Sequence, residues 1–227
     1  MRVTLKTKPL VISFDRAQDG TYQLVRDGDI DADTHFRYAF DLVCKRLNLS
    51  CKCRGYSGCA THSSSTFEFA QEVPEETLLS AAVALTELPA AELALQLING
   101  GVFGPREGEP GFSHLNKSTD SETLKNWAIA YYRANRIEDP DSLICLERNT
   151  LFRFRQVAVE DLQHNLQGTY NTPIKVDAYR QLLQRKTPLP PLICRRRRWD
   201  LYEGYHRLAA CVAEKQDTIA CVVVGRT

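Results

Sequence analysis

Long apolar runs are missing from this 227-residue chain, and none approaches the roughly 18 consecutive apolar residues that a membrane-spanning helix requires. The first residues, Met1 to Lys6, lack the continuous apolar segment of a secretory signal peptide. We therefore expect a cytoplasmic protein that has no membrane partner. The chain has eight cysteines, and without an export signal we expect them to be reduced.

Extreme composition is also absent. The apolar share of 43% and the charged share of 25% are typical of globular proteins, so general disorder is not expected. The net charge of +1 conceals an asymmetry. Residues 151–227 hold thirteen Lys and Arg against seven Asp and Glu, whereas residues 1–150 hold sixteen against twenty-one. The basic end suits a surface that binds anions, or one that attracts the acidic remainder of the chain.

The patterns of residues 1–150 predict an α+β region. Alternating apolar and polar positions over 1–26 indicate a small sheet, and Asp33 is placed to cap a helix over 34–47. Further helices are predicted over 77–86, 89–99 and 121–134. A cysteine-rich loop and the polar tract 61–66 follow the helix over 34–47. A short strand is predicted over 67–69, a loop over 100–120 and a turn at 139–141. We place a domain boundary at 150/151.

The most informative segment lies near the end of the chain. An apolar run at 192–193, a basic corner, a second run at 199–202, an Ala-rich amphipathic segment and the β-branched run 218–224 predict a hairpin, a helix and a strand. At the strand-to-helix junction stands the sequence Gly204-Tyr205-His206-Arg207. Glycine allows close backbone approach, a helix start attracts anions, and His and Arg donate hydrogen bonds to phosphate oxygens. The junction is therefore a candidate phosphate or nucleotide site.

Residues 152–224 resemble the ParB/sulfiredoxin-like superfamily. The resemblance rests on Val157 to Leu162, on Pro190 to Ile193, on Asp200 to Ala210 and on Thr218 to Val224. It implies a mixed α/β core that binds a nucleoside tri- or diphosphate, with or without Mg²⁺, through Gly204, Tyr205, His206 and Arg207. Residues 1–150 resemble no family that we identify, so the predicted fold is α+β (mixed α/β), with this core after an N-terminal α+β region.

Individual members of the superfamily fit less well. Sulfiredoxins carry their catalytic cysteine where this chain has Tyr205, so repair of sulfinic acid is not expected. Partition proteins add a helix-turn-helix that is not found after this core, and serine kinases use an acidic residue just after the opening strand. Glu160 and Asp161 lie close to that position. Together with Glu203 and His206, they are our candidate catalytic residues, as base, metal ligand or phosphate contact.

Three functions follow as alternatives. The first is a phosphotransferase or nucleotide hydrolase, in which catalysis is mostly positioning and charge stabilisation. The second is a DNA-associated protein, either a ParB-like nuclease or a partition-type factor. For that function the run of Arg195, Arg196, Arg197 and Arg198 is the candidate nucleic-acid contact, although such charges also commonly protect an edge strand. The third is a non-catalytic interaction module.

A cysteine cluster raises the question of zinc. Cys44, Cys51, Cys53, Cys59 and His62 fall within nineteen residues, which supplies enough thiol and imidazole groups for a tetrahedral site. The paired C-x-x-C spacing of zinc knuckles is missing, and Cys44 lies on the apolar side of a predicted helix. Reduced cysteines without metal are therefore the preferred interpretation, with a structural zinc at Cys51, Cys53, Cys59 and His62 as the alternative.

Overall fold

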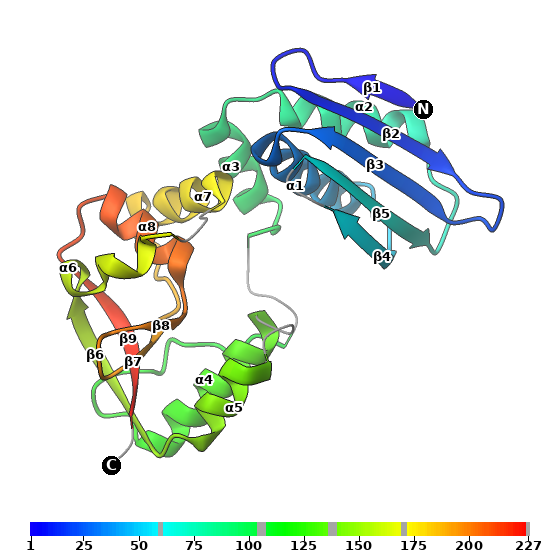
Figure 1. Cartoon of the computed structure of the whole chain (residues 1–227). Coiled ribbons are helices and arrows are strands. Elements are labelled where there is room, and N and C mark those ends of the chain that lie inside the picture. Colours follow the sequence, from blue (N-terminus) through cyan, green and yellow to red (C-terminus); the bar gives the residue numbers. More distant parts are fainter. Residues whose placement is uncertain (59–60, 104–107, 136–139, 169–171, 226–227) are drawn as a thin grey trace. The chain divides into compact units, whose positions relative to one another are not determined.

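The structure is a computed structural model that describes residues 1–58, 61–103, 108–135, 140–168 and 172–225, apart from the side chain of Tyr56. Helices and two separate sheets confirm the predicted α+β class (Figure 1). The chain forms two compact units. Unit 1 is Met1–Phe103 with Thr172–Ile174, and unit 2 is Gly104–Asn171 with Lys175–Thr227.

Unit 1 contains an antiparallel sheet of five strands in the order β1-β2-β3-β5-β4. The strands are β1 (Arg2–Thr4), β2 (Leu10–Arg16), β3 (Tyr22–Gly28), β4 (Cys51–Gly58) and β5 (His62–Phe69). Helices α1 (Ile30–Arg46) and α2 (Glu75–Thr86) pack on one face of this sheet, and α3 (Ala90–Asn99) packs against α1 (Figure 1). Alternate residues of β2 are buried, as the period-2 pattern predicts, and the ring of Phe14 meets Phe40 of α1 with centroids 5.7 Å apart.

Residues 51–69 form a hairpin where we expected mainly loop. The polar tract belongs to β5 because its serines have a buried partner. Arg26 is only 1% exposed, and it donates to the Ser63 and Ser65 hydroxyls at 3.1 and 3.2 Å and to Asp33. Asp33 is therefore an ion-pair partner and not the helix cap. Asp29 caps α1 instead, and its carboxylate accepts from the N–H groups of the first turn.

Unit 2 contains a mixed sheet of four strands in the order β6-β9-β7-β8. The strands are β6 (Leu151–Ala158), β7 (Leu192–Arg195), β8 (Leu201–Glu203) and β9 (Thr218–Gly225). The helices are α4 (Ser121–Asn135), α5 (Pro140–Arg148), α6 (Val159–Leu162), the 3-10 helix η1 (Gln163–Leu166), α7 (Pro173–Gln184) and α8 (Tyr205–Ala213). Helix α7 belongs to unit 2 from Lys175 onward. The strands and the helix predicted for the last forty residues are thereby confirmed.

Both faces of this second sheet are covered. Phe152, Val222 and Val224 pack against α4 and α5, whereas Val157, Cys221 and Val223 pack against α6 and α8. Burial on both sides explains why β9 is a nearly continuous apolar run. Helix α7 is joined to the end of α8 by Arg180, whose Nε donates to Glu214 at 2.7 Å.

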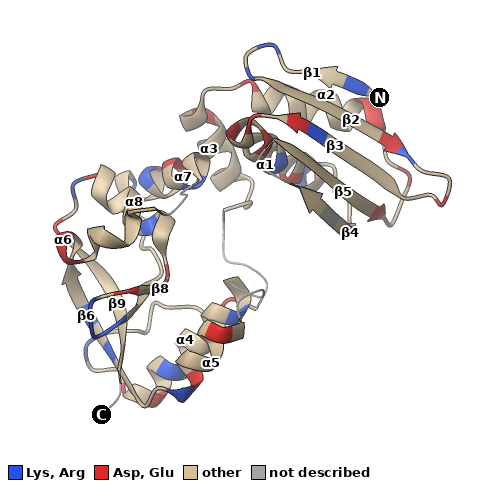
Figure 2. Cartoon of the chain, viewed as in Figure 1, with Lys and Arg blue, Asp and Glu red and all other residues tan. Residues whose placement is uncertain are grey.

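The two compact units divide near residue 103, which differs from the boundary predicted at 150. Helix α4 belongs to unit 2 because Leu124 and Trp127 are buried in the same apolar cluster as β6 and β9. Its partner α5 begins where we predicted only a turn. Lys and Arg residues occur on β6 and on the turn after β7, within the segment whose sequence is basic (Figure 2).

Candidate functional site

The junction between β8 and α8 brings five of the predicted site residues together. Glu203 ends β8, Gly204 follows with φ of +116°, and Tyr205, His206 and Arg207 form the first turn of α8. The N-cap position of this helix is Gly204, which has no side chain to cap it. A Cβ at Gly204 would lie 2.3 Å from Leu192 Cδ2, so glycine is required here both by the positive φ and by close packing.

Arg207 is the innermost residue of the junction, and its side chain is 1% exposed. Its Nη1 donates to the carbonyl oxygens of Pro190 and Pro191, the latter at 3.1 Å. Its Nη2 lies 3.6 Å from Glu203 Oε1 and makes no hydrogen bond with any residue that the structure describes. Arg207 therefore ties the junction to the segment before β7 and leaves one donor nitrogen beside Gly204.

The surroundings of Arg207 keep it charged. Burial by itself would lower its pKa, but Tyr131, Tyr179, Glu203 and Glu109 raise the pKa above the ordinary arginine value. The guanidinium carbon lies 5.2 Å from the centroid of the Tyr131 ring, and burial raises the pKa of that phenol. This phenol and carboxylate environment could not be identified from the sequence, because its members come from α4, α7, β8 and the loop before α4.

The remaining predicted catalytic residues lie on neighbouring positions. His206 is half-buried on α8, and the hydroxyl of Tyr205 donates to the Leu201 carbonyl at 2.9 Å. Glu160 and Asp161 are exposed on α6, which packs against α8 through Leu162 and other apolar residues. The fold therefore places the two carboxylates on a helix that packs against α8 and leaves them accessible to solvent.

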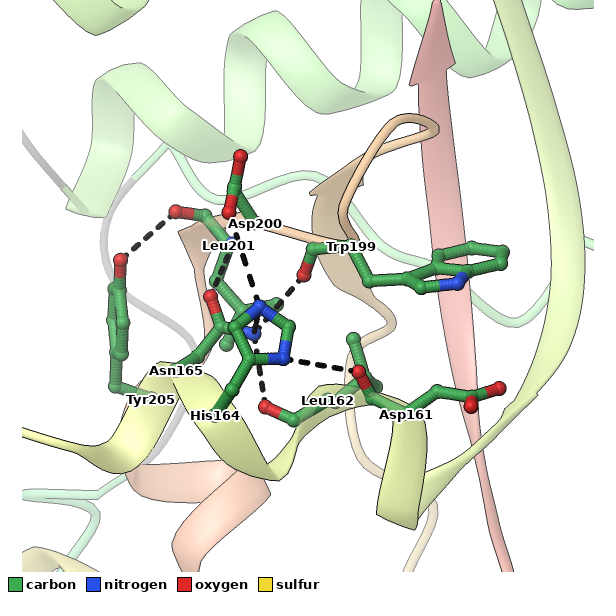
Figure 3. Close-up of polar contacts among 8 residues, drawn as sticks. All are labelled: Asp161, Leu162, His164, Asn165, Trp199, Asp200, Leu201 and Tyr205. Carbon is green, nitrogen blue, oxygen red and sulfur yellow. Dashed lines mark hydrogen bonds and ion pairs between the residues drawn. The ribbon is translucent and has the colours of Figure 1, made fainter.

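A second polar network, missed by the sequence reasoning, connects η1 with β8 (Figure 3). Asn165 Nδ2 donates to the carbonyls of Leu162 and Trp199 at 2.8 and 3.0 Å, and its Oδ1 accepts from the N–H of Leu201 at 2.9 Å. His164 donates from Nδ1 to the Asp161 carbonyl, because only the imidazole can be the donor in that pair. These bonds fix the end of the turn between β7 and β8, where β8 begins.

The tip of that hairpin carries the four predicted nucleic-acid residues, and all four are exposed. Three of them, Arg195, Arg196 and Arg197, line a cavity of about 790 Å³ together with Arg148 and Cys145 of α5. Its other lining residues are Asn149, Tyr202, Val224 and Gly225. The contribution of α5 could not be predicted, because residues 140–148 were not recognised as a helix.

The candidate zinc ligands are separated along the β4–β5 hairpin. Cys51 and Cys53 pair with Phe69 and Phe67, whereas His62 begins β5 at the other end. At a rise of roughly 3.3 Å per residue, His62 is about 16 Å along the strand from the position that faces Cys53. Cys59 lies outside the described residues. Within the described part of the chain, no three His, Cys, Asp or Glu side chains are grouped to hold a metal.

Cys44 and Cys51 interact directly. The Cys44 thiol hydrogen-bonds to Cys51 and lowers the pKa of Cys51, whereas the same bond and burial raise the pKa of Cys44. Cys44 is buried on α1 and Cys51 is exposed on β4. The pair therefore consists of one shielded thiol and one accessible thiol that ionises more readily than an ordinary cysteine.

Comparison with models of protein families, with curated protein sequences and with solved structures found no match to this chain. Among the described helices, none has the length and apolar character needed to cross a bilayer. A functional assignment therefore depends on the chemistry of the site itself.

Proposed function

We propose that unit 2 binds a nucleotide whose phosphate groups lie at the start of α8. One observation carries the proposal: the Nη2 group of Arg207 is a buried cationic donor without a hydrogen-bond partner in the described structure, and it lies beside the glycine that begins the helix. Buried donors are nearly always satisfied, so an orphaned one indicates an unseen ligand or ion. The ParB/sulfiredoxin-like resemblance of residues 152–224 supports the same position.

The first turn of a helix supplies backbone N–H groups and a positive dipole, and both favour a phosphate. Gly204 has no side chain to obstruct that turn. Of His206 and Arg207, His206 is the more accessible and would donate to the phosphate from its imidazole. Arg207 would contact the phosphate only through Nη2. Glu203 is 3.6 Å from that nitrogen and is the candidate to accept from a ribose hydroxyl or to bind Mg²⁺ carried by the nucleotide.

Phosphoryl transfer or hydrolysis at this position would depend on Glu160 and Asp161. Both are exposed on the element beside α8, where a carboxylate could orient a hydroxyl or water. Phosphoryl transfer is catalysed mainly by positioning the reactants and neutralising charge. One carboxylate to orient the nucleophile and a cationic helix start to bind the phosphate would therefore supply the groups that the reaction needs. Catalysis is the second step of the proposal, and nucleotide binding is the first.

Thermal unfolding in the presence of ATP, ADP, CTP and GTP, each with and without Mg²⁺, tests the binding step. A nucleotide present at 100 times its Kd should stabilise the native chain by about 2.7 kcal/mol. His206→Ala should abolish the shift. His114→Ala, an exposed histidine of the loop before α4, is the matched control and should retain it.

Two outcomes contradict the proposal. One is the absence of any nucleotide-dependent shift, which would favour the non-catalytic interaction module. The other is an equal shift in both histidine variants, which would place the nucleotide elsewhere on the chain. If the native chain responds to a nucleotide and only His206→Ala does not, turnover assays with Glu160→Gln and Asp161→Asn then address catalysis.

A further inference from the structure

The cavity beside the β7–β8 turn concentrates positive charge, and its lining differs from the residues of the α8 site. Four arginines line it: Arg148 from the end of α5, and Arg195, Arg196 and Arg197 from the end of β7 and the turn. Among the described residues that line it, none is acidic. Like charges converging on one cavity repel one another, so the arrangement is most stable when an anion is present.

The arginines differ in how they are held. Arg195 donates from Nη2 and Nε to the Tyr202 hydroxyl at 3.1 and 3.3 Å, and its guanidinium lies 5.4 Å from the centroid of that ring. Arg148, Arg196 and Arg197 form no ion pair with any residue that the structure describes. Three of the four cations are therefore available for an external partner.

The backbone holds the turn in an unusual conformation. Arg198 and Trp199 have φ values of +68° and +58°, which non-glycine residues seldom adopt. The N–H groups of Arg195 and Arg196 donate to the carbonyls of Asp200 and Val224, both at 2.8 Å. The Asn165 network fixes the other end of the same turn, at Trp199 and Leu201. The arginines are thus presented from a fixed turn and not from a disordered tail.

We propose that this arginine cavity binds the sugar-phosphate backbone of a nucleic acid. The cations extend from inside the cavity to the exposed Arg198 at the tip of the turn, so they suit several phosphates in succession better than one small anion. Tyr202 is the one aromatic side chain among the described lining residues, and Arg195 lies over a face of its ring, so that face does not stack on a base. Contacts of this kind read the phosphate backbone and not the sequence.

Binding of labelled single-stranded DNA, duplex DNA and RNA oligonucleotides to the full chain, measured by fluorescence anisotropy, tests this proposal. Phosphate contacts by the three available cavity arginines and by Arg198 make four, and on a single strand they predict about a 50-fold loss of affinity between 50 and 200 mM salt. In the triple variant Arg148→Gln, Arg196→Gln, Arg197→Gln, one contact remains. The loss over the same salt range should then fall to about threefold, and affinity at low salt should fall as well.

The matched control removes the same charge from the same unit at exposed positions outside the cavity: Lys117→Gln, Lys186→Gln, Lys215→Gln. This variant should keep the salt dependence of the native chain. A local readout comes from Cys145, an exposed thiol in the cavity lining. Bound oligonucleotide should slow its alkylation, whereas alkylation of Cys51 and Cys53 in unit 1 should not change.

Slower alkylation of Cys145 together with selective loss in the arginine variant supports the proposal. Equal loss of binding in the arginine and lysine variants overturns it, because binding would then follow net charge alone. Protection of Cys145 by pyrophosphate or ATP, with no binding of any oligonucleotide, also overturns it and identifies the cavity as a small-anion site. Because the arginine variant does not alter α8, failure here leaves the nucleotide proposal standing.

Discussion

Replacing Arg207 with methionine should strongly destabilise unit 2. The side chain is 1% exposed, and its loss removes the donors to the Pro190 and Pro191 carbonyls and leaves the Glu203 carboxylate, itself 17% exposed, without its cation. Breaking a buried ion pair by removing one partner typically costs 3–5 kcal/mol, so we expect a loss of about 3–5 kcal/mol in the free energy of unfolding. Methionine fills much of the same space, so most of this loss reflects charge and hydrogen bonding.

Urea unfolding followed by tryptophan emission measures this effect in the full chain. Trp127 and Trp199 are the only tryptophans, and both belong to unit 2, so the signal reports that unit alone. Trp127 also stacks on Tyr131, the ring beneath Arg207, at a centroid distance of 4.9 Å. The control Arg133→Met removes an exposed arginine paired with Glu147 at 2.7 Å and should cost less than about 1 kcal/mol.

A loss below about 1 kcal/mol for Arg207→Met would refute the reasoning, since the guanidinium would then not anchor the junction. An increase in stability would refute it more sharply. That result would mean that the buried cation is held at a cost to the fold and is kept for ligand binding, as residues of functional sites often are.

Three further predictions concern other parts of the chain. Gly204→Ala should destabilise unit 2 by about 2–4 kcal/mol, from overpacking against Leu192 and a left-handed φ, whereas Gly168→Ala, with open space around it, should cost about 1–2 kcal/mol in the same urea assay. Alkylation of Cys51 requires the thiolate, so the alkylation rate should fall as pH is lowered through the depressed pKa of Cys51. Cys44→Ala should move this pH–rate profile to higher pH, because the hydrogen bond that lowers the Cys51 pKa is lost. A pH–rate profile that does not move would contradict the thiol–thiol hydrogen bond. Treatment with a metal chelator should leave the melting temperature of the full chain unchanged, and a drop would indicate a structural zinc in the cysteine-rich hairpin.

The sequence predicted the elements of the last forty residues well because each has a strong local signal. Residues 218–224 are β-branched and apolar enough to indicate a strand, and Gly204 marks the junction before α8. Prediction failed where a polar residue is buried by a distant partner. Ser63 and Ser65 read as loop residues, but their hydroxyls accept from Arg26, which the chain brings to them across β3 and β5.

For the candidate site too, some features follow from the sequence and others only from the tertiary structure. Residues at the β8–α8 junction are contiguous, so the sequence alone determined that Glu203, Gly204, His206 and Arg207 lie together. Only the tertiary structure decided that Arg207 points inward, because its partners are supplied by segments that are remote in sequence. It likewise decided that Arg148 joins the arginines of the turn, since α5 reaches them only after packing against the sheet. Local periodicity fixes helices and strands, but the burial and pairing of charges depend on which elements meet.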